Sequence, residues 1–279
     1  MNIRLVVSDI DGTFINSEGF PSRGALDSIH RLRGQGIGFT LCSGRGDPGI
    51  RPFVELLKLD LPYIVSGGAA ILDAKDRSVI YQRLLTKNQV MAIIDIGLKS
   101  NCDMVFHTST QLFVLCSNDF WKNNCQERWI KKWGWKNVFR CGTKLELLNK
   151  PIIHIHLFNQ DDRLPQLAEE VNDLHANVHV NIVVSKLEIT DCKVNKGLAL
   201  SYLAGYLKVP LKNVLAIGDD VNDISMLKAA GIGVAMKNSP SEVISQVDYL
   251  APGNDEGGLA LMINYLLSDS LDNLRADRN

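Results

Sequence analysis

The chain places two carboxylates two residues apart in the string Asp9-Ile10-Asp11-Gly12-Thr13. The string directly follows an apolar run made by Ile3, Leu5, Val6 and Val7. Such a run, ending in a glycine-containing turn, is typical of a buried parallel strand that delivers the acids to the edge of a sheet. Open α/β sheets keep their ligand sites at this edge. The structural alternative is a turn in which the aspartates only cap the next segment.

Three further strings supply complementary groups. A second acidic string, Gly218–Asp223, follows the strand-like run 214–217. A third apolar run, 37–42, leads into Ser43-Gly44-Arg45, which offers a hydroxyl, a flexible backbone position and a guanidinium. Lys196 opens a helix-like segment and supplies an ammonium group. Two acid clusters, one hydroxyl and one cation have the composition of a metal-assisted phosphoryl-transfer site.

In this order and spacing, the four strings resemble the haloacid dehalogenase-like (HAD) phosphatase superfamily, specifically its Cof-type branch with a large α/β cap (type IIB). The resemblance covers essentially the whole chain. Its C-terminal part is especially specific, with matches at Gly218–Asp223, Met226-Leu227, Ala230-Gly231, Val234–Asn238 and Asp255–Gly258. Two departures, Ser66–Ala69 in place of an Asn-Gly-Ala element and Lys237 in place of a small residue, lie outside the expected chemistry and could alter substrate contacts.

The resemblance implies a magnesium-dependent phosphatase. Asp9 is then the nucleophile that forms an aspartyl phosphate, and Asp11 protonates the leaving oxygen and later deprotonates the hydrolytic water. The implied Mg²⁺ ligands are Asp9, the backbone carbonyl of Asp11 and Asp219, with Asp223 on or beside the metal. The acid at position 11 favours phosphate over carbon–halogen substrates, because the dehalogenases of the family lack it.

Four residues are expected to bind the phosphoryl group: Ser43, the Gly44 amide, Lys196 and Asn222. Lys196 would also offset the charge that spreads over the phosphoryl oxygens during transfer. Two of these assignments have a structural alternative. Lys196 could be a solvated surface lysine, as we expect of Lys193, and Asn222 could simply hold its loop.

Neighbouring charges have structural interpretations of their own. Asp223 could be a first-turn acid at a helix N-terminus, where a negative charge is favoured. The same interpretation fits Asp220 better, so Asp220 is placed outside the site. For Arg45 the sequence favours a role in ordering its loop through a carboxylate over direct contact with substrate.

The elements that must position these residues form an α/β pattern. Strand-like and helical runs alternate over residues 1–84 and again over 187–279, beginning with a short strand at 187–190. This alternation predicts a doubly wound, Rossmann-like parallel sheet, split into two sequence segments. We expect these two segments to form one discontinuous catalytic core.

Residues 85–186 have a different order. Helical patterns are expected over 86–99, 118–133 and 163–175, and strand patterns over 104–107, 112–115, 152–158 and 178–184. Adjacent strands with helices on one side predict a small α+β layer. By resemblance, this segment is the cap domain that closes over the site and contacts the substrate.

Composition restricts the partners. The 279 residues suffice for two domains, and a net charge of −1 without long basic runs gives no reason to expect nucleic acid or a membrane surface as partner. The N-terminus lacks the pattern of a signal peptide, because Ser8, Asp9 and Asp11 interrupt the apolar segment. Cytoplasmic residence is the default expectation, and the oligomeric state stays open.

Other residues of chemical interest have mainly structural interpretations. The six cysteines form no Cys-x-x-Cys pair, and Cys42 beside Ser43 is a weak candidate nucleophile. His154 and His156 share one strand face, but two residues are an incomplete metal site, so packing is the favoured interpretation. The four tryptophans are interpreted as the apolar face of a cap helix, with aromatic cover over a sugar as the alternative; they are Trp121, Trp129, Trp133 and Trp135.

The sequence thus predicts a Mg²⁺-dependent hydrolase of a small phosphorylated metabolite, most plausibly a sugar phosphate. One rival is a phosphomutase of the same capped superfamily, in which the phosphoryl group returns to a bound bisphosphate instead of water. A rival of another class is a non-catalytic phosphoacceptor or phosphate-sensing module. The acid at position 11 and the large insertion argue against that module, since it needs neither a leaving-group acid nor a cap.

Overall fold

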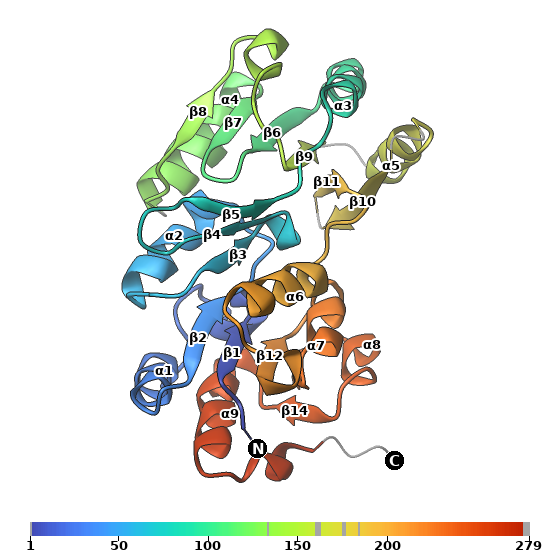
Figure 1. Ribbon diagram of the computed structural model, residues 1–279. Helices are drawn as coiled ribbons and strands as arrows, with labels where there is room; N and C mark the ends of the chain where they lie inside the picture. Colours follow the sequence, from blue (N-terminus) through green and yellow to red (C-terminus); the bar gives the residue numbers. More distant parts are fainter. Residues whose placement is uncertain (1, 133, 160–162, 175–176, 184, 276–279) are drawn as a thin grey trace.

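The computed structural model describes residues 2–132, 134–159, 163–174, 177–183 and 185–275. Trp133, His175 and residue 184, which the sequence placed at the ends of three elements, lie outside the described residues. Figure 1 shows a parallel sheet with its helices in the lower part of the molecule and a six-stranded sheet with its helices in the upper part, with three short strands between them. No helix among the described residues is long and apolar enough to cross a lipid bilayer.

The lower sheet has five strands in the order β14-β13-β12-β1-β2, and all neighbours are parallel. The strands are β1 (Leu5–Ser8), β2 (Gly38–Leu41), β12 (Val214–Gly218), β13 (Ile232–Met236) and β14 (Tyr249–Ala251). Residues from the two ends of the chain meet at its centre, where Leu5 pairs with Val214 and Ser8 with Ile217. The expected split sheet is therefore confirmed.

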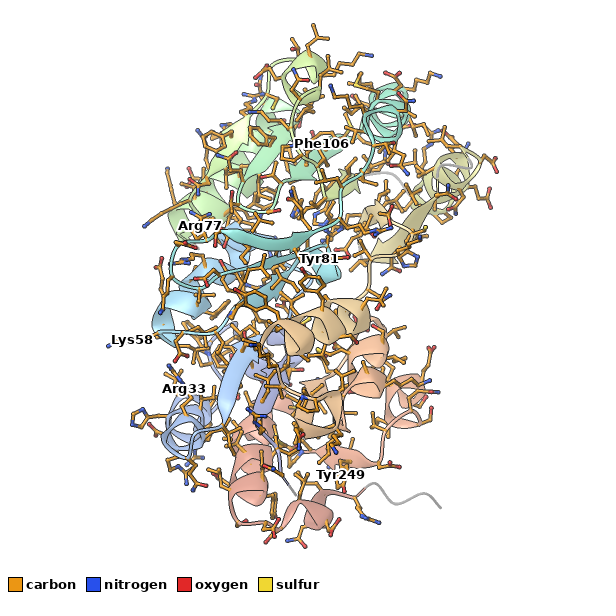
Figure 2. All side chains as sticks on the ribbon, in the orientation of Figure 1. Arg33, Lys58, Arg77, Tyr81, Phe106 and Tyr249 are labelled. Atoms are coloured by element: carbon orange, nitrogen blue, oxygen red, sulfur yellow. The ribbon has the colours of Figure 1, made fainter. Side chains whose placement is uncertain are left out.

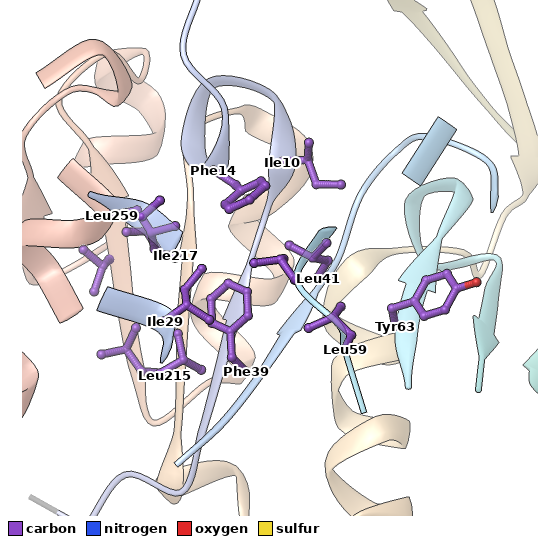
Figure 3. Close-up of a cluster of buried hydrophobic side chains, with 14 of the residues drawn as sticks. Ile10, Phe14, Ile29, Phe39, Leu41, Leu59, Tyr63, Leu215, Ile217 and Leu259 are labelled. Carbon is purple, nitrogen blue, oxygen red and sulfur yellow. The ribbon is translucent and has the colours of Figure 1, made fainter. Parts of the chain in front are cut away.

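Helices cover both faces of this sheet. Alternation along β1 sends Val6 into one apolar cluster with α1 (Ala25–Gly34) and α9 (Gly258–Leu267), and Leu5 and Val7 into another with α6 (Lys196–Tyr206) and α7 (Ile224–Ala229). Figure 3 shows part of the first cluster, where Ile29, Phe39 and Leu215 converge. A strand buried on both faces explains why β1 reads as a continuous apolar run. The short helix α8 (Ser241–Ile244) precedes β14.

Three short strands join the two larger sheets. After β2 the chain forms α2 (Asp47–Leu56) and the antiparallel strands β3 (Tyr63–Val65), β4 (Ala70–Leu72) and β5 (Val79–Gln82). A single parallel bridge between Cys42 and Ile64 connects β3 to the end of β2. Short 3-10 turns occur at Ser66–Gly68, Lys144–Leu147, Leu211–Asn213, Val221–Asp223, Asn254–Glu256 and Leu271–Leu274.

The upper sheet has the order β10-β11-β9-β6-β7-β8 and is antiparallel except for the β7–β8 pair. Its strands are β6 (Asp103–His107), β7 (Leu112–Leu115), β8 (Val138–Arg140), β9 (His154–Phe158), β10 (Val178–Val183) and β11 (Lys186–Asp191). Two helices, α3 (Lys87–Lys99) and α5 (Leu164–Asn172), pack on one face. The helical segment formed by α4 (Asn118–Phe120) and Trp121–Lys132 packs on part of the other face, which is turned toward the parallel sheet.

The expectation that the strand at 187–190 begins the second half of the parallel sheet was wrong. Strand β11 lies between β10 and β9 of the six-stranded sheet, with Leu187 opposite Leu157 and Ile189 opposite Ile155. Its alternating apolar residues complete the cluster beneath α3 and α5. An alternating strand fits either sheet, so the sequence pattern could not decide which of the two it joins. The chain returns to the parallel sheet only with α6 and β12.

Candidate active site

The carboxyl ends of β1, β12 and β2 bring together the acidic strings and the Ser43 loop. The amide of Asp9 donates to the Ile217 carbonyl at 2.9 Å, which continues the β1–β12 ladder by one residue. Asp9 then leaves the sheet on the side where Asp219 follows β12. Because parallel strands end at the same edge, residues more than 200 positions apart become neighbours there.

A buried ion triad lies at the centre of the site. The Lys196 ammonium lies 2.7 Å from Asp9 Oδ1 and 2.5 Å from Asp223 Oδ1. Lys196 and Asp223 are almost completely buried and Asp9 is 5% exposed. The interpretation of Lys196 as a solvated surface lysine is therefore wrong, whereas Lys193 is exposed as expected.

The triad has more negative than positive charge. Burial raises the pKa of Asp9 well above its ordinary value, which Lys196 opposes and Asp223 reinforces. Burial alone would lower the pKa of Lys196, but the adjacent carboxylates of Asp223 and Asp9 raise it well above its ordinary value. The lysine therefore stays protonated, and one ammonium is shared between two carboxylates.

Lys196 is held in place by the start of α6. The Asn195 side chain caps the helix by accepting a hydrogen bond from the Leu198 amide at 2.8 Å. A Cβ at Gly197 would lie only 2.2 Å from the Ser225 carbonyl oxygen, so glycine allows α6 to approach the start of α7 closely. The Asn195-Lys196-Gly197 string thus fixes where the ammonium points.

Asp223 supports the loop after β12. Its Oδ1 binds Lys196, and its Oδ2 accepts hydrogen bonds from the backbone amides of Asp219 and Asp220, both at 3.0 Å. Both carboxylate oxygens of Asp223 are therefore bound by the protein itself, and Asp223 stabilises the turn that carries Asp219. Asp220 accepts a hydrogen bond from the Val221 amide at 2.7 Å, as expected of a capping residue, although it also borders the cavity above the site.

Asp219 is positioned by two residues that the sequence analysis did not single out. Thr13 Oγ1 donates to Asp219 Oδ1 at 2.9 Å. Asn238 Nδ2 lies 3.4 Å from Asp219 Oδ2 and donates to the Gly12 carbonyl at 2.9 Å. Burial, together with the nearby Asp223 and Asp220, raises the pKa of Asp219 to about 7, against the effect of the Thr13 hydrogen bond. Both residues lie in strings that carry the family resemblance, Asp9–Thr13 and Val234–Asn238, and this position in a motif was the one sequence signal that could have pointed to them.

Gly12 allows the first loop to pass directly over Asp219. Its φ is +71°, and a Cβ there would lie 2.1 Å from Asp219 Oδ2. No side chain can occupy this position without moving the carboxylate. Position 12 therefore favours glycine both because its φ is positive and because there is no space for a Cβ.

Asp11 forms a two-point ion pair with Arg45. The guanidinium donates through Nε to Asp11 Oδ2 at 2.8 Å and through NH2 to Oδ1 at 2.5 Å. Arg45 also lies over the Phe53 ring, with 5.4 Å between the guanidinium carbon and the ring centroid. The carboxylate expected to order the Arg45 loop is thus Asp11, whose side chain is 58% exposed.

Ser43 lies at the base of its loop. It is almost fully buried, and its hydroxyl accepts a hydrogen bond from the Arg45 amide at 3.1 Å. The space beside the Gly44 backbone is open. Burial strongly raises the pKa of the Cys42 thiol, so the neighbouring cysteine remains protonated and is not an activated nucleophile.

A cavity of about 830 Å³ connects this site to the six-stranded sheet. The lower wall includes Asp9, Asp11, Gly44, Arg45, Lys196, Asp219 and Asn222. Ser43 and Asp223 do not line this wall; Asp223 lies beneath it. The upper wall comes from the six-stranded sheet and its helical segment, and includes His107, Asn124, Arg128, Trp129, Trp135, His156, Lys186 and Glu188. Sequence reasoning missed most of this wall, because these residues follow no shared motif.

Two tryptophans form an aromatic part of the upper wall. Trp129 and Trp135 stack with ring centroids 5.3 Å apart and an interplanar angle of 26°. Trp129 packs in the apolar cluster of the helical segment as expected, and both rings also border the cavity. Trp129 and Trp135 therefore pack in or against this apolar cluster and also line the cavity.

The two parts of the molecule touch around this cavity. A Cβ at Gly46 would lie 2.6 Å from His107 Nδ1, and one at Gly49 would lie 2.8 Å from the Trp135 ring. Arg77, labelled in Figure 2, donates to the buried Asp47 carboxylate and to the Thr110 carbonyl at 2.9 Å. These contacts place the six-stranded sheet directly over the loops that carry Asp9, Asp11 and Ser43.

Residues 6–263 match the model of the haloacid dehalogenase-like hydrolase family, and the chain belongs to this family. A 5-amino-6-(5-phospho-D-ribitylamino)uracil phosphatase of Bacillus subtilis, YcsE, is 26% identical over 265 residues, which cover 95% of this chain and 96% of the relative. A putative phosphatase of Haemophilus influenzae is 27% identical over 278 residues, covering 94% of this chain and 98% of the relative.

Solved structures give the same fold. A haloacid dehalogenase-like hydrolase from Bacteroides thetaiotaomicron superposes with a TM-score of 0.85 at 26% identity, over 95% of this chain and 99% of the other. The HAD subclass IIB sugar phosphatase BT4131 has a TM-score of 0.79 at 20% identity, over 94% and 98%, and shares the fold. The chain is thus a haloacid dehalogenase-like hydrolase and a phosphoric monoester hydrolase.

Proposed function

We propose that this enzyme is a Mg²⁺-dependent phosphatase that hydrolyses a small phosphorylated metabolite, a sugar or sugar-alcohol phosphate, through an aspartyl phosphate on Asp9. The observation that carries the proposal is the placement of the Asp9 carboxylate 2.7 Å from the Lys196 ammonium at the floor of a covered cavity. A carboxylate there can attack phosphorus while an adjacent cation reduces the repulsion between two anions.

The proposed phosphoryl site uses the lower wall of the cavity. Asp9 would attack through the oxygen not bound to Lys196, and Lys196 would balance charge on the transferring phosphoryl group. The open backbone at Gly44, the Ser43 hydroxyl and Asn222 are the proposed donors to phosphoryl oxygens. The Ser43 hydroxyl can donate its proton to a phosphoryl oxygen while it still accepts the hydrogen bond from the Arg45 amide.

The proposed proton donor is Asp11. In the described arrangement both of its oxygens accept hydrogen bonds from Arg45. To donate a proton to the leaving oxygen, Asp11 must release at least one of these contacts. We therefore infer that substrate binding loosens the Asp11–Arg45 pair, and that Asp11 returns as the base that activates water.

The donor set suits magnesium. Asp9, Asp219 and Asp223 each offer a carboxylate oxygen, and these oxygens lie within 4.8 Å of one another. Burial, and to a smaller extent the neighbouring carboxylates, raise the pKa values of Asp9 and Asp219, and a divalent cation bound beside them would favour their charged forms. Asp9, Asp219 and the Asp11 carbonyl would hold Mg²⁺, with Asp223 as support. Bound there, the ion would supply charge neutralisation and fix the phosphoryl group against the nucleophile.

We propose that the six-stranded sheet and its helices form the cap domain, which reaches from residue 85 through the end of β11. The upper wall combines stacked indoles with Arg128, Lys186 and Glu188, which suits a leaving group that is partly flat and partly polar. The B. subtilis relative YcsE is called a phosphatase of a ribityl phosphate joined to a uracil ring. Such a compound belongs in any substrate panel for this enzyme.

The test is the release of inorganic phosphate from sugar phosphates, ribityl phosphates and an aryl phosphate, with and without Mg²⁺. Wild type is compared with Asp9→Asn and with Asp27→Asn, an exposed acid on α1. Metal-dependent release that Asp9→Asn abolishes and Asp27→Asn retains would support the proposal. An isomeric phosphorylated product that keeps the label of the substrate phosphate would instead identify a mutase. A phosphorylated Asp9 that persists for hours would indicate a phosphoacceptor module.

A further inference from the structure

Three histidines come together on the face of the six-stranded sheet that is turned toward the cavity. His107 at the end of β6 pairs with His154 at the start of β9, and His156 follows two residues later on the same strand. Residues in these positions share one face of a sheet. His107 and His156 also line the cavity. The sequence revealed only the His154–His156 pair, since His107 comes from a distant strand.

The three imidazoles are buried, and apart from a contact between His107 Nε2 and His156 Nδ1 their nitrogens lack hydrogen-bond partners among the described residues. Their exposed fractions are 3%, 2% and 8% for His107, His154 and His156. Within the described part of the chain, four of their six nitrogens have no partner: Nδ1 of His107, both nitrogens of His154 and Nε2 of His156. A buried polar atom left without a partner destabilises the folded protein. Packing alone does not explain three such side chains in one place.

The surroundings keep the rings uncharged. Burial lowers the pKa of all three histidines, and that of His154 falls to about 3, with Lys186 on the neighbouring strand adding to the effect. Glu188, the other charged residue on this face of β11, is paired with Lys186 at 2.6 Å. Neutral imidazole, with a free lone pair, is the form that binds metal ions.

The spacing of the nitrogens is close to that of a tetrahedral metal site. One nitrogen from each ring lies within 4.8 Å of the others. His107 Nε2 and His156 Nδ1 are 3.3 Å apart. Two nitrogens bound at about 2.0–2.1 Å to a tetrahedral Zn²⁺ are separated by about 3.3–3.4 Å. This pair already has the required separation, and His154 would supply the third nitrogen.

We propose that His107, His154 and His156 form a second metal site, for Zn²⁺ or a similar borderline-soft divalent ion, within the cap. The site differs in chemistry from the carboxylate site beneath it, because imidazole suits Zn²⁺ whereas Mg²⁺ prefers oxygen ligands. Glu188 Oε1 lies 3.5 Å from His156 Nε2, on the opposite side of the ring from Nδ1. A carboxylate in this position orients a metal-binding histidine and fixes its tautomer.

Three protein ligands leave the fourth tetrahedral position free. Because His107 and His156 border the cavity, this position opens toward the space above Asp9 and Lys196. A hydroxyl or carboxylate on the leaving group of a bound substrate could occupy it. The site itself does not depend on the phosphatase proposal, since its ligands and its test are separate from Asp9 and Mg²⁺.

The test measures metal binding on the full-length, untagged protein after metals have been removed with a chelator. Zn²⁺ affinity and stoichiometry are measured by calorimetry and elemental analysis, and Co²⁺ is used as a spectroscopic probe of tetrahedral nitrogen ligation. All measurements are made in an Asp9→Asn background, which weakens ion binding at the carboxylates. His154→Gln is compared with His179→Gln, which changes an exposed histidine on β10.

We expect one Zn²⁺ per chain, a tetrahedral Co²⁺ spectrum, and at least a 100-fold loss of affinity in His154→Gln but not in His179→Gln. Glu188→Gln should weaken binding by about 10–100-fold, as expected for a residue that orients a ligand. If His154→Gln does not fold, as judged by circular dichroism, His107→Gln at the cavity wall replaces it. The proposal is overturned if no Zn²⁺ binds, or if binding is unchanged by both His154→Gln and His107→Gln.

Discussion

Gly12 offers a sharp test of how the site is assembled. An alanine at position 12 would place Cβ 2.1 Å from Asp219 Oδ2, whereas real Cβ contacts essentially never fall below 3.0 Å. Asp219 must therefore move by about 1 Å, and a displacement of this size in a catalytic site can cost about 100-fold in rate. Gly19 is the matched control, because its φ is +87° and a Cβ there meets nothing within 4 Å.

Both substitutions carry the same conformational penalty, about 1–2 kcal/mol for a non-glycine residue in the left-handed region. They differ only in the contact with Asp219. We therefore expect Gly19→Ala to lose stability in urea unfolding and to keep its kcat/KM and its Mg²⁺ activation constant. Gly12→Ala should lose at least as much stability, have kcat/KM lower by about 100-fold, and need more Mg²⁺ for half-maximal activity. If Gly12→Ala is as active as Gly19→Ala, the close contact between position 12 and the Asp219 carboxylate does not matter for the reaction, and the reasoning is refuted.

Three further predictions concern the same site. Lys196→Met leaves the Asp223 and Asp9 carboxylates buried without a cation, so we expect a loss of about 3–5 kcal/mol in urea unfolding and loss of phosphate release. The exposed Lys193→Met should change stability by no more than about 0.5 kcal/mol, and equal effects of the two would contradict the buried ion triad. Asn238→Ala removes a donor to the first loop and should cost about 1–2 kcal/mol and raise the Mg²⁺ activation constant; an unchanged constant would show that its hydrogen bonds do not position Asp219. Chelation should stop phosphate release and Mg²⁺ should restore it, whereas activity that survives chelation would refute the metal assignment.

The Asp11–Arg45 pair lies next to a contact with the six-stranded sheet, which we propose is the cap. Arg45 is followed by Gly46, whose backbone lies against His107 of the six-stranded sheet. A shift of the cap would therefore act on the residue that holds the proposed proton donor. Opening and closing of the cap during turnover, which the split arrangement suggests, would change the access of Asp11 to the leaving group.

The sequence by itself predicted the parallel sheet and the residues that we propose carry the chemistry at its edge. The apolar runs before Asp9 and Asp219, each followed by a turn, predict strands buried on both faces, and parallel strands place the residues after their carboxyl ends at one edge. The family pattern then identified Lys196, which local composition could not distinguish from Lys193. These signals are local or lie in short motifs, so they can be recognised in the sequence alone.

The tertiary structure alone decided which sheet β11 joins, which residues form the upper wall, and that His107 meets His154 and His156. Each depends on pairing between distant segments, and an alternating strand or a single histidine carries no information about its partner. The same holds for the Asp11–Arg45 pair and for Thr13 and Asn238 around Asp219. The chemistry of the reaction is carried by residues at fixed positions in motifs, whereas the shape that selects the substrate arises only where separate elements pack together.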